Sequence, residues 1–421
     1  MKDLLLITPP FTQLNTPYPA TAYLKGFLNT KNISSYQIDL GIEVILEIFS
    51  KKGVTEIFNV KPENLSENTQ RIFALKEEYI KTIDEVIAFL QNKKPTLARQ
   101  ICSMNFLPEA SRFNQLDDME YAFGNMGLQD KAKHLATLYL EDLSDYIIEN
   151  IDENFGFSRY AERLGRSANS FDELYQKLQS DKTFVDNFTL EILDKKLLET
   201  QPKLVCFSVP FPGNLYSAFR CAQYIKNHYP NIKTAFGGGF ANTELRDLKD
   251  KRVFEFFDFI TLDDGELPIE LLFENICHSE QSEESLFKRT FLLENGEVVY
   301  KNNSEKHDYK QAEIGTPDYT DLPLDQYISV IEIANPMHSL WSDGRWNKLT
   351  MAHGCYWGKC TFCDISLDYI KIYEPIAAKI LVDRMEELIE KTGENGFHFV
   401  DEAAPPALMR EVALEILKRN L

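Results

Sequence analysis

The sequence predicts an α/β protein with a doubly wound parallel sheet and a large all-helical insertion. Short apolar runs alternate with segments of helical periodicity in residues 1–40 and again in residues 200–280. Between them, residues 41–199 have helical periodicity and almost no strand-like run. A chain of 421 residues can hold two or three domains. We therefore expect one sheet domain formed by 1–40 plus 200–280, with 41–199 inserted into it.

The elements of the sheet domain follow a strand–helix alternation. The apolar run at 4–8 stops at Pro9 and Pro10, as a buried strand that ends in a loop does. Helical spacing follows at 21–28, and a second strand-like run at 34–40. Later strands are expected at 204–209, 233–236 and 257–262, and later helices at 214–227 and 267–276. Helices of the insertion are expected at 71–90, 131–151, 171–178 and 187–199.

One edge of this sheet is the expected ligand site. Right-handed crossovers bring the carboxyl ends of parallel strands to the same edge, where ligands bind in open α/β sheets. The candidate binding residues there are Pro10, Ser208, Gly237, Gly238, Gly239 and Glu266. Three glycines in a row would let a ligand lie against the backbone. The alternative is a glycine-rich strand-end turn that binds nothing.

The rest of the chain divides into two segments. Residues 286–326 are expected to form a hairpin and a linker, with Asn295-Gly296 as a type I′ turn between strands at 291–294 and 297–300. The polar, low-complexity residues just before them indicate a solvated loop. Residues 327–421 form the last unit. Its expected elements are a strand at 348–351, a helix at 375–391, a strand at 397–400 and a helix at 407–420.

Composition restricts the partners. The chain has 65 acidic and 45 basic residues, a formal net charge of -20, which argues against nucleic acid or an anionic membrane as the main partner. No apolar run approaches the ~20 residues that span a bilayer, and the N-terminal run is too short for a signal peptide. Seven cysteines, an odd number with three clustered, fit a reducing compartment. We therefore expect a cytoplasmic protein.

Three cysteines form the most specific motif. Cys355, Cys360 and Cys363 lie in a C-x4-C-x2-C run on one loop. Thiolates are soft ligands that select iron–sulfur clusters or zinc. A [4Fe–4S] cluster held by three cysteines leaves one iron open to a substrate or cofactor. The alternative is a structural Cys3His zinc site that includes His353, although closed zinc sites usually combine two separated ligand pairs.

The strand ending Ile-Thr-Pro-Pro, the later Phe-Gly-Gly-Gly and Asp-Gly-Glu sequences, and the cysteine loop directly after a strand together resemble the cobalamin-binding-domain radical S-adenosylmethionine (SAM) proteins. The resemblance covers 1–40 and 200–421. It implies a Rossmann-like, cobalamin-binding sheet domain followed by the start of a partial (β/α) radical SAM barrel. The three cysteines would hold [4Fe–4S], whose free iron chelates SAM, and an electron from the cluster would cleave SAM to a deoxyadenosyl radical.

The resemblance also implies further contacts. Phe362 matches the aromatic position near adenine, and Asp401 and Glu402 match positions near the methionyl amine. The alternative for these two acids is a strand-end turn with helix N-terminal charge. The family's first spacing is C-x3-C, and a loop absorbs the extra residue found here cheaply. No Asp-x-His-x-x-Gly sequence is present, so cobalamin would bind without a protein histidine on cobalt.

The expected function is therefore a radical SAM enzyme, or the N-terminal part of one, with a [4Fe–4S] cluster and cobalamin. Methyl transfer to an unactivated carbon of a small-molecule substrate is the family's commonest reaction, and a reductant such as flavodoxin or ferredoxin would supply electrons. The segment after Cys363 has room for one further strand, so we expect only two of the family's six barrel strands in all. We therefore expect a fragment, or a barrel completed by another chain, that is inactive alone. The alternative function is a non-catalytic, cluster- or zinc-containing regulatory module that binds a nucleotide-like ligand.

Overall fold

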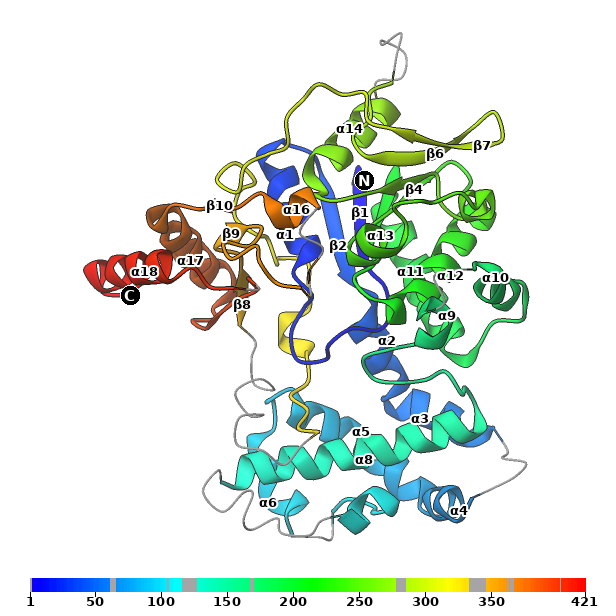
Figure 1. Ribbon diagram of the computed structural model, residues 1–421. Coiled ribbons are helices and arrows are strands. Elements are labelled where there is room, and N and C mark those ends of the chain that lie inside the picture. The colour runs from blue at the N-terminus through cyan, green and yellow to red at the C-terminus, as the bar shows by residue number, and fades with distance from the viewer. Residues whose placement is uncertain are drawn as a thin grey trace.

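The computed structural model describes most of the chain. The described residues are 2–421 except 61–65, 104–105, 116–126, 167–169, 278–284, 333–345, 362, 364–366 and 402. At its centre is a seven-stranded sheet with the strand order β2-β1-β3-β4-β5-β6-β7 (Figure 1). The strands are β1 (Leu4–Thr8), β2 (Ser35–Asp39), β3 (Leu204–Ser208), β4 (Lys233–Gly237), β5 (Phe259–Thr261), β6 (Thr290–Glu294) and β7 (Glu297–Lys301). The predicted α/β class with a mostly parallel sheet is confirmed.

Strands β1 to β5 are parallel, and β6 and β7 extend the sheet antiparallel. The turn between β6 and β7 has positive φ angles at both Asn295 (51°) and Gly296 (79°), so the predicted hairpin is confirmed. The sequence predicts a hairpin that belongs with the linker, in the segment 286–326. In the structure it joins the main sheet instead, with Phe291 of β6 opposite Ile260 of β5.

Helices cover both faces of the sheet, which explains why its strands read as continuous apolar runs. Helices α1 (Ala20–Thr30) and α14 (Glu266–Cys277) cover one face, and α2 (Leu40–Ile48), α11 (Phe184–Thr200) and α12 (Pro212–His228) cover the other. Side chains of β1 alternate between the two cores: Leu4 and Leu6 pack under α1 and α14, whereas Leu5 and Ile7 pack on the opposite side.

The described residues between β2 and β3 form helices and no strand, as predicted. They are α2, α3 (Lys51–Asn59), α4 (Glu67–Ala74), α5 (Lys76–Leu90), α6 (Ala98–Ile101), α8 (Leu128–Asn150), α9 (Glu162–Arg166), α10 (Asp172–Gln179) and α11, with short 3₁₀ turns at Pro95–Leu97 and Ser111–Gln115. Helices α3 to α8 gather below the sheet in Figure 1. Helices α9 to α11 pack against α12, so part of the insertion completes the layer that covers the sheet.

The C-terminal unit is a small layer of its own. Its elements are β8 (Asn347–Leu349), β9 (Ala352–His353), α16 (Asp368–Lys371), β10 (Glu374–Pro375), α17 (Ala378–Thr392), β11 (Phe397–Phe399) and α18 (Pro406–Arg419). Strands β8 and β11 pair in parallel through the crossover helix α17, and β9 pairs antiparallel with β10. Its core includes Leu349 and Leu381 together with Ala22 of α1 and Tyr319 of the linker, so the unit packs directly on the sheet domain.

The linker before this unit is fixed to the sheet domain by polar contacts. Lys25 of α1 forms an ion pair with Asp321, and the Asn29 Nδ2 atom donates to Asp318 Oδ2 at 2.7 Å. Further along, the Tyr327 hydroxyl donates to Asp39 Oδ2 at 2.8 Å, at the end of β2. Among the described residues, no helix is long and apolar enough to cross a membrane.

Candidate functional site

A cavity of about 250 Å³ lies at the carboxyl edge of the sheet, between the strands and helices α1 and α14. Its walls are mainly apolar: Leu6, Cys206 and Ala235 come from the strands, and Leu24, Ile269 and Leu272 from the helices. Its rim is polar. Four of the predicted edge residues line it, namely Ser208, Gly237, Gly238 and Glu266. The structure therefore brings these four together, as parallel strands that end at one edge require.

The other two predicted edge residues lie outside the described lining of this cavity. Pro10 is buried in the loop after β1, and the Asn214 side-chain amide fixes this loop by donating to Pro9 O and Phe11 O, both at 2.8 Å. Gly239 begins the short helix α13 (Gly239–Glu244). Both residues thus belong to neighbouring loops of the same edge, without facing the cavity.

Close packing of the backbone explains why glycine is present at positions 238 and 239. Gly238 has φ = 102°, and a Cβ atom there would lie 2.9 Å from Val209 N. A Cβ atom on Gly239 would lie 2.7 Å from Pro210 O. The turn after β4 therefore packs against the loop after β3 only because it carries glycine. This packing accounts for the glycines whether or not a ligand binds there.

An acidic group at the rim is tied to the cysteine loop. The His353 Nε2 atom lies 3.0 Å from Asp264 Oδ1, and its Nδ1 atom lies 3.1 Å from Ile372 O. The hydrogen bond to Asp264 raises the pKa of His353 to about 9. Burial raises the pKa of Glu266 to about 7, and the Asp264 charge adds to this increase. His353 is thus a charged link between the base of the cysteine loop and the rim of the cavity.

This contact bears on the zinc alternative. Both ring nitrogens of His353 already face oxygen atoms, so a Cys3His site that uses His353 would have to break one of these contacts. Sequence reasoning identified His353 only as a zinc ligand, and it identified Asp264 only as part of an Asp-Gly-Glu turn. No local signal connects two residues that are 89 positions apart.

The cysteine loop starts from a fixed base and then becomes exposed. Gly354 has φ = 68°, and a Cβ atom there would overlap Ile372 O. The Cys355 backbone amide donates to Ile370 O at 3.1 Å. All three cysteines are free thiols, with Cys355 and Cys363 half-buried and Cys360 exposed. Within the described part of the chain, no group of three His, Cys, Asp or Glu side chains is close enough to hold a metal ion.

Of the three residues predicted to contact SAM, the structure describes only Asp401. Phe362 and Glu402 lie outside the described residues. Asp401 is half-buried, and its carboxylate accepts hydrogen bonds from the backbone amides of Met351 (2.8 and 3.0 Å) and Ala352 (2.9 Å). It therefore holds the backbone that leads into the cysteine loop. Burial raises the pKa of Asp401, and the two amides oppose this increase.

Sequence reasoning also missed Tyr23. This α1 residue lines the cavity, and its hydroxyl accepts a hydrogen bond from the Thr350 backbone amide at 2.7 Å. It is a second direct connection between the cavity and the strand region before the cysteine loop. Nothing in its local sequence distinguishes it from an ordinary buried helix residue.

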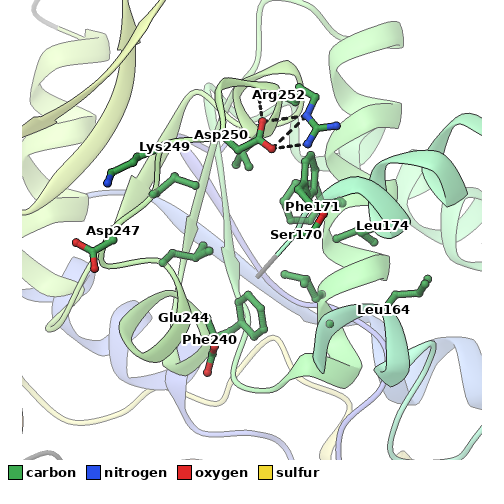
Figure 2. Close-up of a pocket in the computed structure, with 16 residues that line it drawn as sticks. Leu164, Ser170, Phe171, Leu174, Phe240, Glu244, Asp247, Lys249, Asp250 and Arg252 are labelled. Carbon is green, nitrogen blue, oxygen red and sulfur yellow. Dashed lines mark hydrogen bonds and ion pairs between the residues drawn. The ribbon is translucent and has the colours of Figure 1, made fainter. Parts of the chain in front are cut away.

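A second cavity of about 490 Å³ lies on the other side of the molecule, between α9, α10 and the segment that follows α13 (Figure 2). Its floor is apolar, with Leu174, Phe219 and Phe240 buried there. At its rim Arg252 is paired with both Asp250 and Asp172, so these charges satisfy one another. None of the predicted site residues lines this cavity.

In comparisons with known proteins, no family model and no curated protein matches the chain.

Proposed function

We propose that this chain is a radical SAM protein that carries a [4Fe–4S] cluster on Cys355, Cys360 and Cys363 and cobalamin at the sheet edge. One observation carries the proposal: the His353–Asp264 contact joins the base of the cysteine loop to the rim of the apolar cavity. A cluster on this loop and a ligand in this cavity would therefore lie on the same side of the molecule.

The residues present fit both groups. Three reduced thiols on one loop are a donor set for a soft metal centre, and three thiolates leave one iron with an open position. The cavity has apolar walls and lies between the sheet and two helices, which suits a flat, largely apolar group such as the benzimidazole base of cobalamin. Its described lining contains no histidine, so this wall offers no imidazole to cobalt.

When bound, the cluster supplies the electron that cleaves SAM, and cobalamin carries a methyl group. The chain's own residues hold the loop in place. Asp401 fixes the backbone by accepting hydrogen bonds from the amides of Met351 and Ala352. His353, two residues before Cys355, contacts Asp264 and so attaches the start of the cysteine loop to the sheet domain. The proposed reaction is methyl transfer to an unactivated carbon of a small molecule, with a flavodoxin or ferredoxin as electron donor.

A second candidate function has its own observation. Cys360 and the neighbouring Trp357 are exposed, so the described residues leave the cysteine loop open to solvent. A radical reaction requires a site that excludes water. An open loop favours a binding or regulatory module that holds a cluster or zinc, with a nucleotide-like ligand and without turnover.

Anaerobic reconstitution of the full chain tests both functions. The proposal expects about four iron and four sulfide per chain, and deoxyadenosine formation from SAM with dithionite. Cys360→Ala should abolish both signals, whereas Cys102→Ala, outside the loop, should keep them. Iron and sulfide without deoxyadenosine would favour the regulatory module. Stoichiometric zinc in a colourless protein would refute the cluster.

A further inference from the structure

The second cavity, between α9, α10 and the segment after α13, has a wall that is mainly apolar. Of the 16 residues that Figure 2 draws around it, nine are leucine, phenylalanine or valine. On its floor, Leu174 and Phe219 are each 2% exposed and Phe240 is 4% exposed. The ring centroids of Phe171 and Phe219 lie 5.2 Å apart. The floor is therefore a surface of large side chains that are fixed by packing against one another.

The charged side chains of this cavity lie at its rim. Arg252 forms ion pairs with Asp250 (2.5 Å) and Asp172 (2.8 Å), so its charge is neutralised from two sides. Asp247 and Lys249 are exposed, and in Figure 2 their charged ends point away from the phenylalanine side chains. The part of a ligand that enters the cavity would therefore contact an uncharged surface.

An apolar hollow of this size lowers the stability of a folded protein. Protein interiors are closely packed, and voids larger than a water molecule are few. Larger side chains in the wall would fill the space and bury more apolar surface, which would stabilise the fold. The cavity measures about 490 Å³, which is within the range of roughly 300–1,000 Å³ that small-molecule sites occupy. Its size and its apolar wall are those of a site for an apolar ligand.

This cavity is separate from the one at the edge of the sheet. The described linings of the two cavities have no residue in common. Gly237 and Gly238 line the edge cavity, whereas Phe240 and Glu244, on the helix α13 that follows them, line the second cavity. Helices α9 and α10 belong to the insertion, which the resemblance does not cover. A ligand here would therefore depend neither on the cluster nor on cobalamin.

We propose that the second cavity binds an uncharged, apolar small molecule, whose polar end is a neutral group such as a hydroxyl at the rim. The leucine and phenylalanine floor holds the apolar body by dispersion and by burial of apolar area. The inference goes beyond the proposed function, because it assigns a separate ligand to a part of the molecule that the proposed reaction does not use.

The charges at the rim favour a neutral ligand over a charged one. The described lining includes more acidic than basic side chains, namely Glu244, Asp247 and Asp250 against Lys249 and Arg252. A carboxylate or phosphate head group, as in a fatty acid or a phospholipid, would be repelled by this acidic excess. A cationic head group would gain little, because the carboxylates are either exposed to solvent or paired with Arg252.

The test is a fluorescence titration of the full chain with N-phenyl-1-naphthylamine, an uncharged aromatic probe whose emission rises in apolar surroundings. The wild type should bind it saturably. Leu248→Trp, at a half-buried position of the lining, fills the cavity and should weaken binding about tenfold or more. The matched control is Leu24→Trp, at a half-buried position of the edge cavity, which should bind the probe as the wild type does. Thermal unfolding checks that both variants are folded. If Leu248→Trp does not fold, Leu245→Trp repeats the test at another half-buried leucine of the same lining.

The pair of variants locates the probe. Loss of binding in Leu248→Trp and not in Leu24→Trp supports the proposal. If Leu24→Trp alone weakens binding, the probe lies at the edge of the sheet and the second cavity is not its site. Equal binding by the wild type and both variants, or no saturable binding by the wild type, also refutes the proposal.

Competition between ligands with the same ten-carbon chain tests the class of head group. Decan-1-ol should displace the probe, and decanoate should need an about threefold or higher concentration because of the acidic rim. If decanoate displaces the probe at a lower concentration than decan-1-ol, Arg252 binds a carboxylate in place of its aspartate partners, and the proposed class is wrong. Displacement by decylamine at a concentration tenfold or more below that of decan-1-ol would likewise replace the neutral ligand by a cationic one.

Discussion

The His353 Nε2 atom lies 3.0 Å from Asp264 Oδ1, and this contact joins two parts of the chain that the sequence presents as unrelated. His353 immediately precedes the cysteine loop, and Asp264 follows β5 at the rim of the edge cavity. Together with the Tyr23–Thr350 hydrogen bond, it fixes where the loop emerges relative to the sheet.

Replacing Asp264 by alanine should loosen the base of the cysteine loop. It leaves the His353 Nε2 atom without its carboxylate partner, and a partly exposed contact of this kind is worth about 1 kcal/mol. Hydrogen exchange followed by mass spectrometry should show faster exchange in peptides that contain the Cys355 amide. Asp247→Asn, at an exposed position, serves as control. Unchanged exchange around Cys355 would show that Tyr23 and Asp401 alone hold the loop.

Asp401 should act first as a structural residue. Asp401→Ala removes the acceptor of two backbone amides, which should cost about 1–3 kcal/mol of unfolding free energy. Asp401→Asn keeps one oxygen acceptor and should cost less. Thermal unfolding checks the order of the two variants, with Glu390→Ala on the exposed side of α17 as control. The resemblance makes the opposite prediction: if Asp401 contacts the SAM amine, Asp401→Asn weakens SAM binding and leaves the unfolding temperature unchanged.

The two glycines with positive φ offer a matched comparison. Gly238→Ala places a Cβ atom 2.9 Å from Val209 N in a left-handed conformation, whereas Gly296→Ala meets no atom within 4 Å. Gly296→Ala should therefore cost only the conformational penalty, about 1 kcal/mol, and Gly238→Ala should cost clearly more. Urea unfolding of both variants measures the difference. Equal losses would mean that the turn after β4 can move away from Val209.

The free energy of unfolding should decrease as the pH rises, because the buried carboxyl of Asp39 loses its proton. Burial raises the pKa of this carboxyl to about 6, above its unfolded value of about 3.9, so the folded state binds the extra proton. Its stabilising contribution is complete below about pH 3.9 and is lost as the pH rises through about 6. The loss should reach about 3 kcal/mol.

Asp39→Asn isolates this effect. Asparagine is a good N-cap for α2 and stays neutral, so the variant should match the wild type near pH 4 and exceed it in stability at pH 8. Urea unfolding at several pH values gives the two curves. If the curves are parallel, the amides of Gly41 and Ile42 and the Tyr327 hydroxyl stabilise the carboxylate enough to cancel its burial.

Much of the sheet follows from local sequence because its strands are buried on both faces. The run Leu4–Thr8 and the Asn295-Gly296 turn carry their structure in their own residues. The pairing of β6 with β5 does not, because an antiparallel addition to a parallel sheet has no local signature. Likewise, the spacing of the three cysteines predicts a shared loop, but the contact between His353 and Asp264 depends on how two distant segments pack.

Filling the edge cavity should separate stability from cobalamin binding. Ala235 is buried on β4 and lines the cavity, so Ala235→Val has room for its two extra methyl groups and should leave unfolding free energy nearly unchanged. Ala222→Val, at a buried position on α12 under the other face, should instead cost about 1–3 kcal/mol by overpacking. In the same proteins, Ala235→Val should weaken the binding of cobalamin, because it narrows the space for the benzimidazole base of the nucleotide tail. Equal binding of cobalamin to Ala235→Val and the wild type would place the tail elsewhere.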